Sequence, residues 1–169
     1  MQAGQILRLL LPVFLGLGLS ISALADLGPR ISELTHLDQQ YMGQQREIID
    51  DLARAELGSQ INGNRANDLN VLQRLLDRGL VQAQQTLELQ AMGIILGDLL
   101  AAELDMHWVI YQDSIGRSRA LRYRQSEECL FPVTMISRRW EVGNRKPVAD
   151  IYQKAYDIID AARPPAPFQ

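Results

Sequence analysis

Cysteine is nearly absent from this sequence, because Cys129 is the only one in 169 residues. A single cysteine cannot form a disulfide within its own chain, so the fold has to depend on its hydrophobic core. Leu130 and Phe131 follow it directly, and these apolar neighbours favour a buried thiol over a disulfide between two chains.

Motifs for catalysis, metal binding and cofactor binding are missing as well. The chain has no G-x-S-x-G, no H-E-x-x-H, no phosphate-binding glycine loop and no dinucleotide fingerprint. Its two histidines, His36 and His107, lie far apart, and no zinc-ligand spacing is present, so we expect no metal and no cofactor. An envelope hydrolase using His107 and Cys129 stays open as an alternative, although Glu127 and Glu128 would raise the pKa of the thiol.

An excess of charge is also lacking. The chain carries 17 basic and 20 acidic residues, a net charge of −3 that argues against nucleic-acid binding. The two signs are unevenly distributed, since residues 26–113 hold 6 basic and 14 acidic residues while residues 117–169 hold 10 basic and 6 acidic ones. The second half is therefore the basic half.

Residues 1–25 have the layout of a secretory signal peptide, with Arg8, an apolar run and a closing Ala-Leu-Ala. We expect cleavage before Asp26 and a periplasmic protein without a membrane span; an uncleaved anchor is the alternative. Residues 26–163 have the size of one domain, and a proline-rich tail follows at residues 164–169.

A long amphipathic helix is predicted to begin after Pro29 and to end at Gly58. Its apolar residues recur three or four positions apart at Ile31, Leu34, Leu37, Tyr41, Ile48, Leu52 and Ala55. One hypothesis makes this helix an oligomerisation arm, but Asp38 and Gln44 interrupt a sustained heptad.

Two further helices follow in the acidic half. Asn67 or Asp68 is predicted to cap a second helix rich in leucine. Residues 87–104 are apolar on almost every side, so this third helix is expected at the centre of the domain. Gly93 and Gly97 lie four residues apart on it and predict close packing against another segment.

The sequence after the third helix changes to short strand patterns. Residues 107–111 and 120–124 predict a hairpin, and residues 129–131 predict a third strand. Helical spacing resumes after Pro132, with a fourth strand over residues 133–137 as the alternative, and a last helix begins near Pro147. The fold class is therefore α+β: N-terminal helices and a central buried helix packed on a small antiparallel sheet of about three strands, with a closing C-terminal helix.

The strongest candidate for a site is a cluster of basic residues in the sheet region. Its members are Arg117, Arg119, Arg122, Arg124, Arg138, Arg139, Arg145 and Lys146. Guanidinium groups on one strand face could bind carboxylates or phosphates in a bidentate manner. We select as binding residues Arg117, Arg122, Arg124, Arg138, Arg139 and His107. The alternative is that these arginines only pair with the acidic helices of the same domain.

A family resemblance rests on short motifs in the second half of the chain. They are Leu96-Gly97-Asp98, Trp108-Val109, Asp113, Gly116-Arg117, Ala120-Leu121, Phe131-Pro132, Met135-Ile136 and Arg138-Arg139. Over residues 87–156 the chain resembles a bacterial exported domain of unknown function, DUF3806. The resemblance implies an envelope domain of Gram-negative bacteria and carries no activity, cofactor or catalytic residue with it.

These observations favour a non-catalytic periplasmic domain over an enzyme. Its partner would be an envelope protein or an anionic ligand, held by an arginine-rich contact face. The sequence leaves the oligomeric state open.

Overall fold

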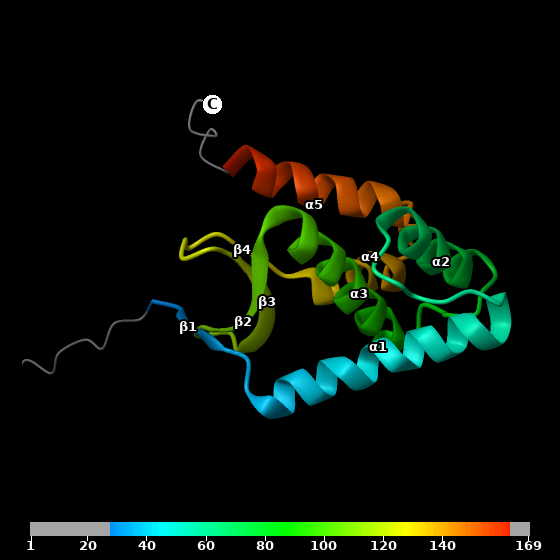
Figure 1. Ribbon diagram of the computed structural model, residues 1–169, viewed down its shortest axis with the longest axis horizontal. Helices are drawn as coiled ribbons and strands as arrows, with labels where there is room; N and C mark the ends of the chain where they lie inside the picture. Colours follow the sequence, from blue (N-terminus) through cyan, green and yellow to red (C-terminus); the bar gives the residue numbers. More distant parts are fainter. Residues whose placement is uncertain (1–27, 163–169) are drawn as a thin grey trace, which may run out of the picture.

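The computed structural model describes residues 28–162, in which one strand and three helices precede a run of three strands and the last helices (Figure 1). The described elements are β1 (Arg30–Glu33), α1 (His36–Leu57), α2 (Arg65–Asp77), α3 (Thr86–Leu104), β2 (Met106–Gln112), β3 (Arg117–Tyr123), β4 (Cys129–Leu130), a 3-10 turn η1 (Pro132–Thr134), α4 (Ser137–Glu141) and α5 (Val148–Ala162). The predicted signal peptide and the predicted C-terminal tail from residue 164 onward lie outside the described residues. The α+β class is confirmed.

The first helix begins later than predicted, because Thr35 and Asp38 form a capping box. The Thr35 hydroxyl accepts the Asp38 backbone N–H, and the Asp38 carboxylate accepts the Thr35 N–H. The helical prediction for the residues before Thr35 is wrong, since they form β1 and pair with β2. The predicted end is confirmed: Gly58 adopts the left-handed conformation that suits glycine at a helix C-terminus.

The second helix begins earlier than predicted. Asn64 is its N-cap and accepts the Asn67 N–H, so the prediction of Asn67 or Asp68 as the cap is wrong. Asp68 instead lies in the first turn, where its buried carboxylate accepts the N–H groups of Asn62 and Gly63. A carboxylate there holds the preceding loop and also suits the positive end of the helix dipole.

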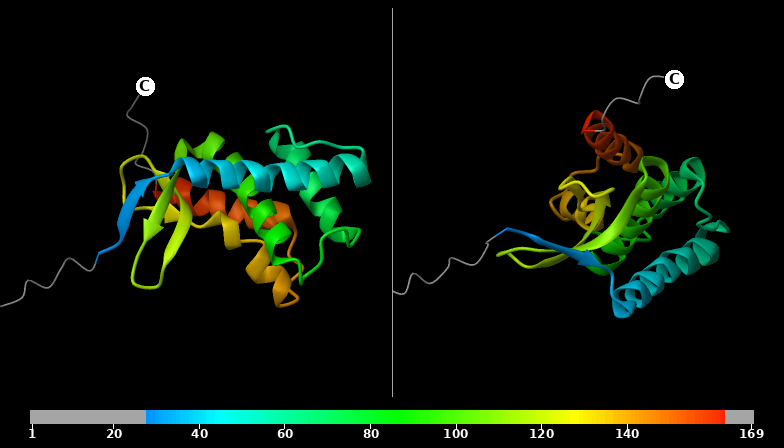
Figure 2. Two further views of the ribbon diagram at one scale, coloured as in Figure 1. Left: turned by 90° about the horizontal axis from the view of Figure 1, so that it is seen from below. Right: turned by 60° about the vertical axis from the view of Figure 1, so that its left-hand side comes forward.

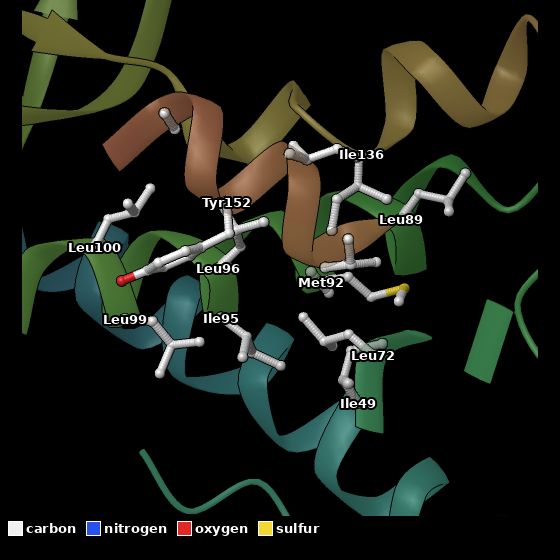
Figure 3. Close-up of a cluster of buried hydrophobic side chains, with 14 of the residues drawn as sticks. Ile49, Leu72, Leu89, Met92, Ile95, Leu96, Leu99, Leu100, Ile136 and Tyr152 are labelled. Atoms are coloured by element: carbon white, nitrogen blue, oxygen red, sulfur yellow. The ribbon is translucent and has the colours of Figure 1, made fainter. Parts of the chain in front are cut away.

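Helix α3 occupies the centre, as its apolar sequence predicts, and it contacts α1, α2, α4 and α5 as well as β2 and β3. Figure 3 shows side chains of α1, α2 and α5, among them Ile49, Leu72 and Tyr152, around Ile95 and Leu96 of α3. Removing this apolar surface from water is the main force that stabilises the fold. Among residues 28–162, no helix is both long and apolar enough to cross a bilayer.

The two glycines of α3 make the close contacts that their spacing predicts. A β-carbon at Gly93 would lie 2.6 Å from the Pro132 carbonyl oxygen, and one at Gly97 would lie 2.7 Å from the Trp108 ring. Both separations are too short for any side chain. The 3-10 turn and strand β2 are therefore seated directly on the backbone of α3.

In the described part of the chain the sheet has four antiparallel strands in the order β1-β2-β3-β4, one more than the sequence indicated. The predicted hairpin is confirmed, with Met106 opposite Tyr123 at one end and Gln112 opposite Arg117 at the other. Figure 2 shows the sheet at one end of the molecule, with the helices packed beyond it. The alternative of a strand over residues 133–137 is wrong, because this stretch belongs to η1 and the start of α4.

Candidate functional site

The arginines of the sheet region separate into two groups. Arg117 and Arg119 of β3 and Arg138 of α4 line one groove at the outer end of the hairpin. Other arginines of the cluster are engaged in holding local structure. The Arg138 side chain is exposed, and among the described residues no hydrogen bond or ion pair of its guanidinium group is found.

A buried carboxylate anchors the two arginines of β3. Asp38, at the start of α1, accepts from Arg117 at 2.6 Å and from Arg119 at 2.9 Å, and its side chain is only 4% exposed. It also accepts the Thr35 hydroxyl at 2.6 Å. The Arg119 guanidinium lies over the Tyr41 ring, 4.3 Å from its centre, a favourable arrangement for a cation. Helix α1 therefore holds the outer end of β3 through one charged contact.

This contact shifts the titration of both partners. The Arg117 hydrogen bond, opposed by burial and assisted by Thr35, holds the pKa of the Asp38 carboxyl well below its usual range. The same hydrogen bond raises the pKa of Arg117. Both groups are therefore charged at neutral pH, and one carboxylate pairs with two guanidinium groups.

The groove has a volume of about 460 Å³ and a mixed lining. Tyr111 and Phe131 meet edge to face on it, with ring centres 5.2 Å apart. The Asp113 carboxylate, in the hairpin turn, accepts the N–H groups of Ile115 and Gly116 and is thereby turned toward the backbone. With Asp38 and Asp113 set against three guanidinium groups, the groove retains an excess of one positive charge.

Arg122 and Arg124 do not join this groove. Arg122 donates to the carbonyl oxygens of Ser126 and Gln125 and so closes the turn between β3 and β4. Arg124 lies beyond the end of β3, with a positive φ, and forms an exposed ion pair with Asp105 at 3.3 Å. Arg122 and Arg124 therefore do not form the shared strand face that the sequence suggested.

The arginines that follow in α4 and its C-terminal turn also differ in use. The Arg139 guanidinium donates to the Met135 carbonyl oxygen, and the Arg145 guanidinium donates to that of Trp140. These bonds satisfy carbonyl groups of short helical turns, which is a structural task. Of the pair Arg138-Arg139, only Arg138 points to the groove.

His107 and Cys129 lie in one cross-strand row, but Arg122 stands between them. Two strand spacings separate the histidine from the cysteine, roughly 10 Å, which is beyond hydrogen-bond reach. Burial raises the pKa of the half-buried Cys129 thiol; Arg122 lowers it and Glu128 raises it. The arrangement gives neither an activated thiolate nor a base beside it.

A metal site is not evident in the part of the chain that the structure describes. Within residues 28–162, no group of three or more histidine, cysteine, aspartate or glutamate side chains is placed to hold an ion. Apart from the arginines, polar groups in the groove are Asp113, Ser118 and Thr134, and the tyrosine hydroxyl. This lining suits the binding of an anion.

Sequence reasoning missed Asp38 as a partner of the groove and included Arg119 only as a member of the larger cluster. Asp38 looked like an interruption of an apolar helix face, whereas it is the third residue of the helix and closes a capping box with Thr35. The Thr-x-x-Asp spacing was the available signal for a helix start at His36. Nothing local in the sequence links Asp38 to Arg117, which is 79 residues away.

Comparison with solved structures supports the fold. A crystal structure of a protein from Bacteroides thetaiotaomicron VPI-5482 superposes with a TM-score of 0.69 at 21% sequence identity. The similarity covers 77% of this chain and 48% of that one, so this chain spans about half the length of its structural relative. At that identity the likeness concerns the fold alone.

Comparison with protein families gives the relationship by sequence. No curated protein matches the chain. A family model matches residues 68–152, starting earlier than the resemblance over residues 87–156 indicated and taking in most of α2. The match contains Arg117, Arg119 and Arg138, whereas Asp38 and β1 precede it. The chain belongs to the family described as Domain of unknown function (DUF3806).

Proposed function

We propose that this protein is a non-catalytic binding domain of the periplasm that holds an anionic ligand or an anionic group of an envelope partner. The observation that carries this proposal is the groove at the end of the hairpin, which three arginines line and where Asp38 holds two of them, Arg117 and Arg119. Arginine suits carboxylate and phosphate groups because its planar fork donates two parallel hydrogen bonds.

The residues of this proposed site are fewer than the sequence suggested. Among the described residues, Arg138 is the arginine of the groove without an ion pair, while Arg117 and Arg119 are positioned by Asp38. Arg117 keeps donors available, since its side chain is still 43% exposed. Arg122, Arg124, Arg139 and His107 stand outside the groove lining. Their substitution should leave ligand binding unchanged wherever the fold is kept.

Thermal unfolding with citrate and with inorganic phosphate tests the binding proposal. A ligand at about a hundred times its dissociation constant adds roughly 2.7 kcal/mol to the free energy of unfolding, which raises the midpoint by several degrees. We expect one of these anions to stabilise the wild type and the Lys154→Ala variant, which loses an exposed charge on α5. Arg138→Ala should lose the shift.

Two outcomes would contradict the proposal. One is that neither anion, titrated into the millimolar range, moves the midpoint of the wild type. The other is that Arg138→Ala and the wild type shift equally, because the ligand would then bind elsewhere. If citrate raises the unfolding midpoint and phosphate does not, the site prefers carboxylates. If only phosphate raises the midpoint, the site prefers phosphates.

The periplasmic part of the proposal rests on residues 1–25 and has its own experiment. We expect a C-terminally tagged protein to appear in the periplasmic fraction with Asp26 as its N-terminal residue by Edman sequencing. Recovery of the intact N-terminus in the membrane fraction would favour the uncleaved anchor.

A further inference from the structure

Within residues 28–162, the outer half of β3 has no strand beside it on one side. Strand β4 pairs only with Leu121 and Arg122, after which the chain turns away into η1. Residues Arg117–Ala120 therefore form a free sheet edge, and the groove runs along it. A free edge of this kind is a template for another extended segment.

The hydrogen-bond pattern shows which backbone groups point outward. The Asp113 N–H donates to the Gly116 carbonyl oxygen, so even-numbered residues of β3 bond toward β2. The Tyr123 N–H donates to the Glu128 carbonyl oxygen, so odd-numbered residues bond toward β4. By this alternation Arg117 and Arg119 direct their N–H and C=O groups to the free edge. Among the described residues, no hydrogen bond is found to engage them there.

The two sides of this edge differ in chemistry. Arg117 and Arg119 extend their side chains toward α1, the same side of the sheet as Trp108 and Leu121. Tyr111 lies on the opposite side of the sheet, because it pairs with Ser118, which alternates with Arg117 and Arg119 along β3. The Tyr111 ring contacts Phe131. An added strand would thus place alternate side chains near arginines and near aromatic rings.

We infer that the ligand of this groove is an extended acidic peptide segment that pairs with the backbone of Arg117 and Arg119. This inference rests on the proposed anion site and assigns the class of ligand to it. Acidic side chains at every second position meet Arg117, Arg119 and Arg138, and the intervening apolar side chains meet Tyr111 and Phe131. Main-chain hydrogen bonds supply affinity and the alternating side chains supply specificity, as in other cases of strand addition.

Fluorescence anisotropy with a labelled, blocked Glu-Val-Glu-Val-Glu-Val hexapeptide tests the inference. We expect saturable binding to the purified protein and at least tenfold weaker binding to Arg138→Ala, with Lys154→Ala as the matched control. The decisive probe is the same hexapeptide with N-methyl groups on the three alternate residues whose N–H groups face β3; methylating the other three is its control. Methylation keeps all charges but removes strand pairing, so the first peptide should bind at least tenfold more weakly than the second.

The outcomes separate this inference from the proposed function. Equal binding of the two methylated peptides would overturn strand pairing while leaving an anion site. Stabilisation by citrate or phosphate without any peptide binding would likewise overturn the peptide class alone. If the β3 edges of two copies pair with each other, sedimentation will show a dimer that the hexapeptide does not dissociate, and the inference fails. If neither the anions nor the peptide binds, both the proposed function and this inference are wrong.

Discussion

The interior around α3 and the outer end of the hairpin are held together by different interactions. Around α3, stability comes from apolar packing so close that Gly93 and Gly97 have no room for a side chain. At the hairpin, it comes from one buried carboxylate that pairs with two arginines 79 and 81 residues further along the chain. The packing at these two glycines leaves no space between the segments, whereas the contact at the hairpin leaves charged donors beside an open groove.

The largest change in stability is expected at the glycines of α3. Gly93→Ala should lower the free energy of unfolding by about 3 kcal/mol, because the new β-carbon meets backbone carbonyl groups that cannot move aside. The same change at Gly43, inside α1, meets nothing within 4 Å and should raise it by about 1 kcal/mol through helix propensity. Urea unfolding of both variants checks the opposite signs; two stabilised proteins would show that α3 can shift away from η1.

At the outer end of the hairpin, Asp38→Asn should lower the free energy of unfolding by about 2 kcal/mol at pH 7. Removing the buried charge leaves two arginines without their partner, and the partial exposure of Arg117 moderates the cost. Because the pKa of Asp38 is lower in the folded state than in the unfolded chain, where it is about 3.9, the stabilisation is complete above about pH 5 and fades as the pH falls further.

Unfolding at pH 7 and at pH 3 therefore gives a specific test of the same variant. The gap between the wild type and Asp38→Asn should narrow at pH 3. A gap that stays constant would mean that the carboxylate acts through the shape of the helix cap and not through its charge.

A smaller effect is expected where the two regions meet. Trp108 packs on Gly97 and donates its ring N–H to Asp98 at 2.9 Å, and Asp98 also accepts from Arg46 of α1. Trp108→Phe should cost about 1–2 kcal/mol through the lost hydrogen bond and the smaller ring. Asp98→Asn, compared by thermal unfolding, should cost less because the Arg46 ion pair is partly exposed. If Asp98→Asn costs more stability than Trp108→Phe, the ion pair contributes more than the tryptophan.

The smallest change concerns Arg124, which holds a left-handed conformation at φ 49°. Arg124→Gly should raise the free energy of unfolding by up to about 1 kcal/mol, since relief of backbone strain exceeds the loss of an exposed ion pair with Asp105. Chemical denaturation measures the change, and citrate binding should be unaffected. A loss of stability would show that the ion pair matters more than the strain.

The two regions also differ in how far the sequence predicts them. The apolar character of residues 87–104 and the glycine in the hairpin turn are local signals, and both gave the correct elements. Strand β1 was predicted as helix because Ile31 and Leu34 fit helical spacing. In the fold, Ile31 pairs with Tyr111 of β2, which is distant in sequence. The sequence shows the arginine cluster. It does not show which arginines line the groove and which hold local structure, because that depends on contacts that only the fold creates.

Strand β1 also sets a condition on the order of folding. It precedes every other described element in the chain, yet it pairs with β2, whose residues are synthesised after three complete helices. Such a distant partner makes the pairing slow compared with the formation of local helices. A nascent chain that ends before Met106 can form α1 and α2, but neither the pairing of β1 nor the neutralisation of Asp38 can occur. The pairing of β1 therefore has to wait for β2, and the neutralisation of Asp38 has to wait for the arginines of β3.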